Sequence, residues 1–579
     1  MISLNHMSRY RGWLLSDYFD EETKKELNKI EDNEEEIEDR FYTDLKFGTG
    51  GMRGKIGAGT NRMNKYTVRK ATQGLANYIV NYNDNGLEKG VVIAYDSRHK
   101  SYEFALEAAL VLNGNDIKAF LFDKLTATPE LSFSVRELNA VAGIVITASH
   151  NPSEYNGYKV YGEDGGQVVP EKARKITAEI EEITDFSLVK RINRDEAEKK
   201  GLLEIIGEEM DEGYTEEMLK VIPDKKLCAT KGDNFSVIYT PLHGTGNRPV
   251  QCLLKELGIN VKVVEKQAEP DPYFSTVDSP NPEEFSAFAM ALKMAKTEQP
   301  DLILGTDPDA DRMGMIIKND CGEYTPLTGN QIGVLMADYL LNNMDISEEG
   351  VIIKTIVTTE MVKKIAAEFD VEVIDVLTGF KFIGEKIESF EREHNKDFIL
   401  GFEESYGYLI GTYARDKDAV IACGLATAMT LHYKNEGSSL YKRLNELRNK
   451  YGYYLEDLES VKLEGKKGQE VINETLHILR EEKSREVADK KVNVFKDYQK
   501  GISYNYNKNN EENILLPKSN VLQYCLADES LITIRPSGTE PKLKMYFAVC
   551  GENKKVAKSR LQELKDKFLD RVNNIINSL

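Results

Sequence analysis

Cysteine is scarce in this sequence, and its positions form no recognisable pattern. The six cysteines occur singly, without a CxxC pair and without paired histidines nearby. A disulfide framework and a zinc site both require such spacing, so we expect neither. Scattered thiols of this kind are typical of a cytoplasmic protein, and that is the location we predict.

Long apolar segments are also missing. The longest weakly polar run, residues 419–431, is too short to cross a bilayer, which takes about 20 apolar residues. Near the start of the chain only Trp13, Leu14 and Leu15 form an apolar run, so a secretory signal is not expected. We therefore expect no membrane partner.

Basic residues are fewer than acidic residues, with 76 Lys and Arg against 96 Asp and Glu. The formal net charge is −20 and the pI is about 5.1. General binding to nucleic acid or to an anionic membrane is therefore disfavoured, because both are polyanions. A small anionic ligand remains compatible with this chain, provided that a local basic pocket binds it. The sequence leaves the oligomeric state open.

The middle of the chain shows one order of elements three times. At roughly 100–200 residues per domain, 579 residues predict three to five domains. An apolar strand followed by a helix and another strand begins at residues 90–98, 235–240 and 350–359. This alternation predicts mostly parallel α/β sheets, in which ligands bind beyond the carboxyl ends of the strands.

The two ends of the chain depart from that order. Residues 1–45 are charged and predict a solvated amphipathic helix. Residues 481–513 are mostly polar and predict a loop inserted at the surface. Residues 531–551 predict two strands around a loop, and a final helix follows, so the chain ends in a small α+β domain. The apolar face of that helix consists of Leu561, Leu564, Phe568, Val572 and Ile575.

The stretch "TASHNP" follows the apolar strand 144–146 and presents Ser149 beside His150. The hydrolase elbow G-x-S-x-G is absent, and a serine is a weak nucleophile unless its surroundings activate it. Neighbouring serine and histidine side chains rarely point at each other, so we do not expect a dyad. A nucleophile and a simple Ser/Asn turn both remain open.

The stretch "DPDADR" places Asp307, Asp309 and Asp311 at alternate positions after a buried strand. Three carboxylates that converge would repel one another unless a cation neutralises them, and hard oxygen ligands suit Mg²⁺. An EF-hand is excluded, because Arg312 and Lys318 occupy the positions that need Gly and Glu. The alternative is a solvated acidic turn.

Two further polar loops follow strands. In "GFEESYGYL", Glu403 and Ser405 offer acceptors for sugar hydroxyls, although a polar β-turn would look the same. In "RPSGTEPK", Arg535 supplies planar donors and a glycine lets the backbone approach a phosphate closely. This loop lacks the Walker A pattern, and a hairpin turn is its alternative.

Taken in this order, the four loops resemble those of the α-D-phosphohexomutase superfamily. The resemblance covers nearly the whole chain and is greatest to the long branch that includes bacterial phosphoglucomutases and phosphopentomutases. It implies three related α/β domains and a smaller C-terminal α+β domain around a central cleft. We expect these domains at residues 1–205, 206–325, 326–450 and 451–579.

The resemblance also implies a reaction. A phosphoryl group would move between O1 and O6 of a hexose through a phosphoserine. Mg²⁺ would be the cofactor, and glucose 1,6-bisphosphate would be both the intermediate and an activator. Ser149 would carry the phosphoryl group, and its phosphoserine oxygen would join Asp307, Asp309 and Asp311 around the metal. His150 would orient the phosphoserine.

Lys159 would be a general acid/base and Arg53 an active-site arginine; to act as a base, Lys159 needs a lowered pKa. The implied substrate contacts are Arg312, Thr378, Gly379, Lys381, Glu403 and Ser405, and the implied clamp on the non-reacting phosphate is Arg535, Ser537, Gly538 and Thr539.

Several interpretations compete. The loop "GFEESYG" resembles that of the enzymes that act on glucose phosphates. A glucose phosphate is therefore the favoured substrate, a mannose phosphate is second and a pentose phosphate is third. A non-catalytic phosphosugar-binding protein would need neither Ser149 nor the three aspartates. A serine hydrolase is the weakest interpretation, because the chain lacks its elbow.

Overall fold

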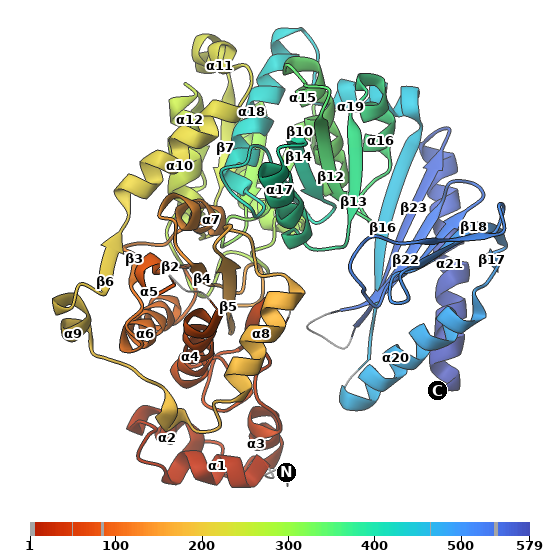
Figure 1. Cartoon of the computed structure of the whole chain (residues 1–579). Helices are drawn as coiled ribbons and strands as arrows, with labels where there is room; N and C mark the ends of the chain where they lie inside the picture. The colour runs from red at the N-terminus through yellow and green to blue at the C-terminus, as the bar shows by residue number, and fades with distance from the viewer. Residues whose placement is uncertain (1–5, 49, 83–85, 464, 538–541) are drawn as a thin grey trace. The chain divides into compact units, whose positions relative to one another are not determined.

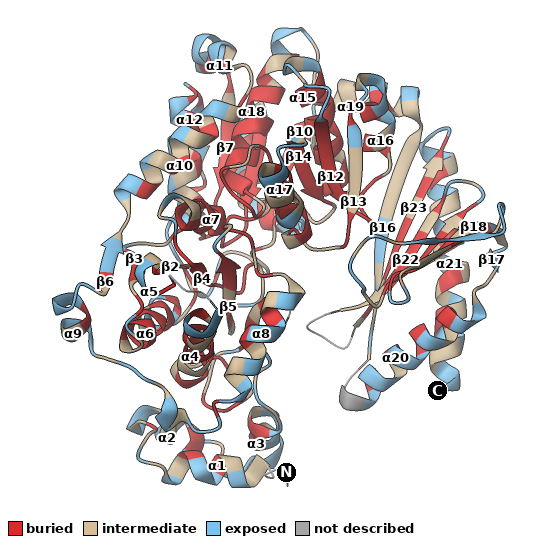
Figure 2. Cartoon of the chain, viewed as in Figure 1, coloured by how far each residue is buried: buried red, intermediate tan, exposed pale blue. Residues whose placement is uncertain are grey.

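The computed structural model describes residues 6–48, 50–82, 86–463, 465–537 and 542–579 (Figure 1). The chain divides into two compact units. The first comprises Met1–Ile332 and Phe380–Gly437, and the second comprises Gly333–Gly379 and Ser438–Leu579. Buried residues concentrate on the central strands of the sheets, as Figure 2 shows.

The first unit begins with three short helices, α1 (His6–Leu15), α2 (Glu21–Asn28) and α3 (Glu34–Phe41). The prediction of one solvated helix is therefore wrong. The helices enclose an aromatic cluster in which Trp13 stacks on Phe19 at 4.1 Å and meets Phe41 and Tyr66 edge-on. Charged residues cover the outside, which explains why the segment looks wholly solvated in the sequence.

A six-stranded sheet follows, with the order β1-β5-β4-β2-β3-β6. Strands β2, β3, β4 and β6 are parallel, and β5 and β1 continue the sheet in antiparallel fashion. Helices α4, α6 and α8 pack on one face and α7 on the other. The bounds are β1 Gly51–Lys55, β2 Val91–Tyr95, β3 Ala119–Phe122, β4 Ala142–Ile146, β5 Tyr155–Gly162, β6 Leu203–Ile206, α4 Lys65–Tyr82, α6 Ser101–Gly114, α7 Thr128–Glu137 and α8 Pro170–Glu181.

A five-stranded sheet of the same unit has the order β11-β10-β9-β7-β8. Its central strands are largely apolar and buried, as expected for strands covered on both faces. The first unit also contains a hairpin of β14 and β15 with helices α17 and α18. The bounds are β7 Ser236–Thr240, β8 Asn260–Val263, β9 Leu302–Thr306, β10 Met313–Lys318, β11 Tyr324–Pro326, β14 Asp397–Glu403, β15 Gly407–Leu409, α17 Lys381–Glu393 and α18 Ala419–Asn435.

The second unit contains the parallel pair β12 and β13 and a large antiparallel sheet. The large sheet has the path β16-β23-β22-β21-β18-β19-β20, and helices α20 and α21 bury their apolar sides against it. The bounds are β12 Gly350–Thr355, β13 Glu372–Val376, β16 Tyr453–Lys462, β18 Lys490–Asp497, β19 Ile502–Asn505, β20 Asn510–Asn513, β21 Leu522–Leu526, β22 Leu531–Pro536, β23 Lys542–Gly551, α20 Gly465–Glu482 and α21 Lys554–Ser578.

The prediction of a surface loop over residues 481–513 is wrong. Strands β18, β19 and β20 occupy most of it, together with the short strand β17 (Glu486–Val487). A register shift between Val492 and Val494 breaks the apolar alternation of β18. Strand β20 lies at the end of the sheet with all of its residues exposed, so it carries no apolar signal.

The predicted fold class, mixed α/β followed by a smaller C-terminal α+β part, is confirmed. The three-helix start, the two α/β sheets and the antiparallel terminal sheet account for it. Within the described parts of the chain, every helix is too short or too polar for a membrane span. The expected domain boundaries stay a prediction.

Candidate active site

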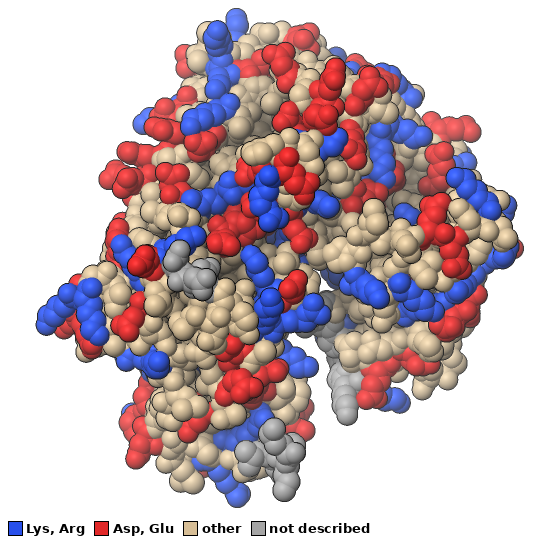
Figure 3. Space-filling view, viewed as in Figure 1, with Lys and Arg blue, Asp and Glu red and all other residues tan. Residues whose placement is uncertain are grey.

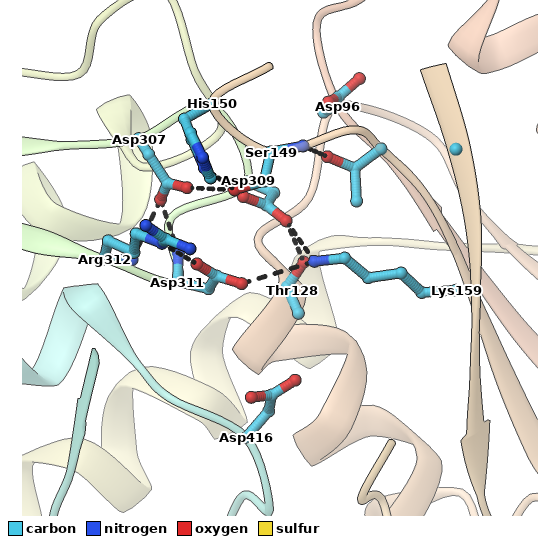
Figure 4. Close-up of polar contacts among 12 residues, drawn as sticks. Asp96, Thr128, Ser149, His150, Lys159, Asp307, Asp309, Asp311, Arg312 and Asp416 are labelled. Carbon is cyan, nitrogen blue, oxygen red and sulfur yellow. Dashed lines mark hydrogen bonds and ion pairs between the residues drawn. The ribbon is translucent and has the colours of Figure 1, made fainter. Parts of the chain in front are cut away.

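Ser149 lies three residues after β4, in a left-handed backbone conformation with φ 52°. Its side chain is buried, and its Oγ donates to Asp307 Oδ2 at 2.6 Å (Figure 4). The same Oγ lies 3.2 Å from His150 Nδ1. The expectation that these neighbouring side chains would not meet is therefore wrong, because the sharp turn at Ser149 brings them together. Left-handed backbone at a residue other than glycine is strained and is typical of functional sites.

The three aspartates follow β9 and converge as predicted. One ligand oxygen from each of Asp307, Asp309 and Asp311 lies within 4.8 Å of the others, and all three residues are buried. Asp307 Oδ1 accepts the backbone N–H groups of Asp311 and Arg312 at 3.0 Å, which curls the loop. The buried Oδ1 atoms of Asp309 and Asp311 accept no hydrogen bond from a described residue. Such a set of carboxylate oxygens fits a hard divalent cation.

The pKa values of Asp307 and Asp309 shift in opposite directions. Burial raises the pKa of Asp307 well above its usual range, and the neighbouring Asp309 and Asp311 raise it further. Burial would also raise the pKa of Asp309, but Lys159 and a hydrogen bond with Asp307 lower it below its usual range. Asp307, the carboxylate next to Ser149, is therefore the member of the triad that takes up a proton most readily when no cation is bound.

Lys159 reaches the triad from β5. Its Nζ lies 2.8 Å from Asp309 Oδ2 and 3.4 Å from Asp311 Oδ2. Burial alone would lower the pKa of Lys159, but Asp309 and Asp311 outweigh it and raise the pKa. The shift is opposite to the lowered pKa that a general base needs, so Lys159 is a cation in this arrangement.

Arg53 and His150 flank the serine turn. Strand β1 pairs with β5, and this pairing carries Arg53 to the turn, where its Nη1 donates to Asn151 Oδ1 at 2.8 Å. Burial lowers the pKa of His150 well below its usual range, and the cations Arg312 and Arg53 lower it further. The imidazole is therefore neutral at neutral pH.

The predicted sugar loop forms the turn between β14 and β15. Glu403 ends β14 and is buried, and Ser405 lies in the turn. The Tyr406 carbonyl accepts the Met313 N–H at 3.0 Å, which joins this turn to the strand after the aspartate loop. Arg312, next to that strand, forms an ion pair with Glu283.

The remaining predicted residues fall in different parts of the chain. Lys381 begins α17 in the first unit, and burial lowers its pKa to about 8 against the opposing charge of Glu385. The others belong to the second unit. Thr378 and Gly379 follow β13, and Arg535 donates to the Tyr546 hydroxyl at 3.1 Å. Ser537 donates its N–H to the Lys542 carbonyl at 2.7 Å, whereas Gly538 and Thr539 lie outside the described residues.

Sequence reasoning missed two residues at the triad. Lys417 Nζ lies 2.8 Å from Asp311 Oδ2. At the start of α7, Thr128 donates its N–H to the Asp309 carbonyl at 2.9 Å and its hydroxyl to Asp309 Oδ2 at 3.3 Å. The charged run "ARDKD" and the strand-to-helix turn "TATPE" were the available signals. Neither stretch indicates which residue it contacts. Thr128 and Asp309, for example, are separated by 181 positions in the sequence.

Family models match three successive parts of the chain. The models for phosphoglucomutase/phosphomannomutase alpha/beta/alpha domains I, II and III match residues 44–186, 212–322 and 328–451. The chain belongs to this family. The resemblance to the α-D-phosphohexomutase superfamily, drawn from the four loops, is thereby confirmed.

Curated members of the phosphoglucomutase/phosphomannomutase family align over most of the chain. The phosphoglucomutase of Staphylococcus haemolyticus is 39% identical over 519 residues, which are 89% of this chain and 92% of that protein. The phosphoglucomutase of Staphylococcus epidermidis is 36% identical and covers 93% of this chain and 96% of its own.

Solved structures of the family share the fold. Parafusin, a phosphoglucomutase from Paramecium in an open form, has a TM-score of 0.68 at 18% identity and covers 93% of this chain and 96% of its own. A putative phosphomannomutase from Thermus thermophilus has a TM-score of 0.66 at 20% identity, with coverage of 92% and 99%.

Proposed function

We propose that this protein is a phosphoglucomutase, an isomerase that interconverts α-D-glucose 1-phosphate and glucose 6-phosphate. The observation that carries the proposal is the buried Ser149 hydroxyl, which lies 2.6 Å from Asp307 in the aspartate triad. The curated relatives at 36–39% identity that bear the name phosphoglucomutase support the choice of glucose. Ser149 carries the phosphoryl group, and glucose 1,6-bisphosphate is the intermediate.

Mg²⁺ is the proposed cofactor. Asp307, Asp309 and Asp311 would hold it, together with an oxygen of phosphorylated Ser149. When bound, the ion would supply positive charge that offsets the charge of the phosphoryl group. Two buried carboxylate oxygens that accept no hydrogen bond from the described residues support this assignment.

The proposed cycle has two balanced halves. In the first, the bond between phosphorus and Ser149 Oγ breaks, a sugar hydroxyl oxygen binds phosphorus, and the hydroxyl proton passes to the serine oxygen. In the second, Ser149 Oγ takes the other phosphate of the bisphosphate, and its proton passes to the released sugar oxygen. The intermediate turns over inside the protein between the two halves, so that either end of the sugar reaches Ser149.

The side chains around Ser149 receive distinct roles. The neutral imidazole of His150, 3.2 Å from Ser149 Oγ, orients the serine and relays its proton. Lys159 stays protonated beside Asp309 and serves as an acid and as a counter-charge to the phosphoryl oxygens. Arg53 holds the serine turn through Asn151 and adds positive charge on the same side.

The remaining residues bind the substrate. Their side chains match its two kinds of group, because carboxylates and hydroxyls accept from sugar hydroxyls, whereas arginine and lysine bind phosphate. Acidic and basic side chains intermingle over the face shown in Figure 3, which favours a small ligand over a polyanion. The proposed substrate contacts are Arg312, Thr378, Gly379, Lys381, Glu403 and Ser405, and the proposed clamp on the non-reacting phosphate is Arg535, Ser537, Gly538 and Thr539.

A turnover panel tests the proposal. Glucose 1-phosphate, mannose 1-phosphate and ribose 1-phosphate are supplied separately with Mg²⁺ and the matching bisphosphate, and the isomerised product is quantified. We expect fast conversion of glucose 1-phosphate. Equal or faster conversion of another sugar phosphate would support the mutase chemistry but contradict the assignment of glucose as the substrate. Binding without turnover of any of the three would favour a non-catalytic phosphosugar-binding protein.

A further inference from the structure

Behind the serine turn lies a buried arginine that the proposed cycle does not use. Arg98 comes three residues after β2, and its side chain and that of Asp96 are both fully buried. A buried guanidinium is costly unless its N–H groups find acceptors. The acceptors of Arg98 therefore show what the residue is for.

Four of those acceptors are main-chain carbonyl oxygens of one short segment. Nη1 donates to the carbonyls of Pro152 at 2.8 Å and Tyr155 at 3.0 Å. Nη2 donates to the carbonyls of Ser149 and Asn151. One planar group thus spans the whole turn from Ser149 to Tyr155, which includes the strained residue itself.

The guanidinium is itself held in place. Its Nε lies 3.3 Å from Asp96 Oδ2, and Asp96 Oδ1 accepts the Ser101 hydroxyl at 2.7 Å. Phe274 belongs to the part of the first unit that contains the five-stranded sheet. Its ring covers the guanidinium, and the ring centroid lies 4.9 Å from Arg98 Cζ. Because Asp96 offsets the charge, the contribution of Arg98 is geometric more than electrostatic.

We propose that Arg98 is a positioning residue for phosphoryl transfer. It binds the carbonyls of the turn and so holds Ser149 in the left-handed conformation that keeps Oγ against Asp307. The Phe274 contact ties this turn to the part of the unit that carries the aspartates. This role rests on the proposed function, in which Ser149 must both give and accept the phosphoryl group at one fixed point.

Lysine cannot replace this contact. Its ammonium is a compact point charge with three donors, whereas the guanidinium offers a rigid planar fork. An Arg98→Lys variant therefore keeps the charge beside Asp96 and loses the simultaneous contact with four carbonyls. The matched control is Arg62→Lys, because Arg62 is also buried and binds the carbonyls of Asp39 and Asn61, away from the serine turn.

The first measurement is steady-state kinetics with glucose 1-phosphate. For Arg98→Lys we expect kcat to fall by about 100-fold, because misplacement of a reacting group by about 1 Å costs that much. KM should change less than about threefold, since the proposed sugar and phosphate contacts are other residues. Arg62→Lys should leave both values close to those of the parent. An unchanged kcat in folded Arg98→Lys, or a change confined to KM, would overturn the proposal.

The second measurement needs no turnover. Hydrogen exchange read by mass spectrometry should be faster in the peptide spanning residues 147–155 of Arg98→Lys than in Arg62→Lys. Equal exchange in the two variants would overturn the clamp. If the parent protein converts no phosphosugar, the proposed function fails, and the exchange result alone still decides whether Arg98 holds the turn. A Phe274→Leu variant, which removes only the ring over the guanidinium, should show both effects in weaker form.

Discussion

The hydroxyl of Ser149 lies 2.6 Å from the carboxylate of Asp307, although 158 positions separate the two residues. The serine follows a strand of one sheet of the first unit, and the aspartate follows a strand of the next sheet. The contact places a potential phosphoryl carrier directly on a potential metal site. The sequence around either residue does not indicate that the two side chains meet.

Replacement of that serine should stop the reaction. Ser149→Ala removes the oxygen that takes the phosphoryl group, so we expect turnover of glucose 1-phosphate to fall by at least about 1,000-fold, as for other nucleophiles. Ser153→Ala, four residues along the same turn, is the control and should keep near-normal turnover. Full activity of Ser149→Ala in a coupled assay would rule out the phosphoserine mechanism.

Thr128 should tune the affinity for Mg²⁺. Its hydroxyl lies 3.3 Å from Asp309 Oδ2, on the oxygen that Lys159 also contacts, and this leaves Oδ1 for the cation. Loss of an outer partner of this kind typically weakens metal binding by about 10–100-fold. We expect Thr128→Val to need correspondingly more Mg²⁺ for half-maximal activity, and Thr128→Ser to resemble the parent. A Mg²⁺ titration of the three proteins would show equal midpoints if Thr128 has no such role.

Lys381 should give the reaction a pH dependence on the alkaline side. Burial lowers its pKa to about 8, so the ammonium form is present below that pH and is lost above it. If the ammonium binds the anionic substrate, KM rises as the pH passes upward through about 8. Arginine stays charged throughout this range.

We therefore expect Lys381→Arg to remove the rise in KM on the alkaline side of that pKa. The profile of the parent protein, measured in the same buffers, provides the reference. A parent KM that stays flat as the pH passes through the pKa would contradict the assignment of Lys381 as a cationic substrate contact.

The N-terminal aromatic cluster should contribute strongly to stability. Trp13 is 5% exposed and packs against Phe19, Phe41 and Tyr66, whereas Leu15 on the same helix is 82% exposed. Trp13→Ala should lower the free energy of unfolding of this region by about 3–5 kcal/mol. Leu15→Ala should change it by less than about 0.5 kcal/mol. Urea unfolding followed by circular dichroism would contradict this if the two variants had equal midpoints.

The sequence could predict the features that lie within one short segment. Apolar runs such as residues 144–146 and 302–304 identify buried strands, because local burial needs only local composition. The polar loops after those strands indicated the candidate residues, since ligands bind at strand ends. Local composition failed at residues 481–513, where a bulge and an exposed edge strand hide the alternation.

What the sequence determined by itself, then, is the kind of most elements and the chemistry of each loop. Only the tertiary structure decided which loops meet. The pairing of β5 with β1 places Lys159 and Arg53 on neighbouring strands, Lys159 reaches Asp309 of the next sheet, and helix α7 brings Thr128 to the same aspartate. These encounters also set the protonation, because the pKa of Lys159 rises only where two buried carboxylates face it. Such contacts join residues far apart in the chain, and they depend on sheet order and turn geometry that no local pattern encodes.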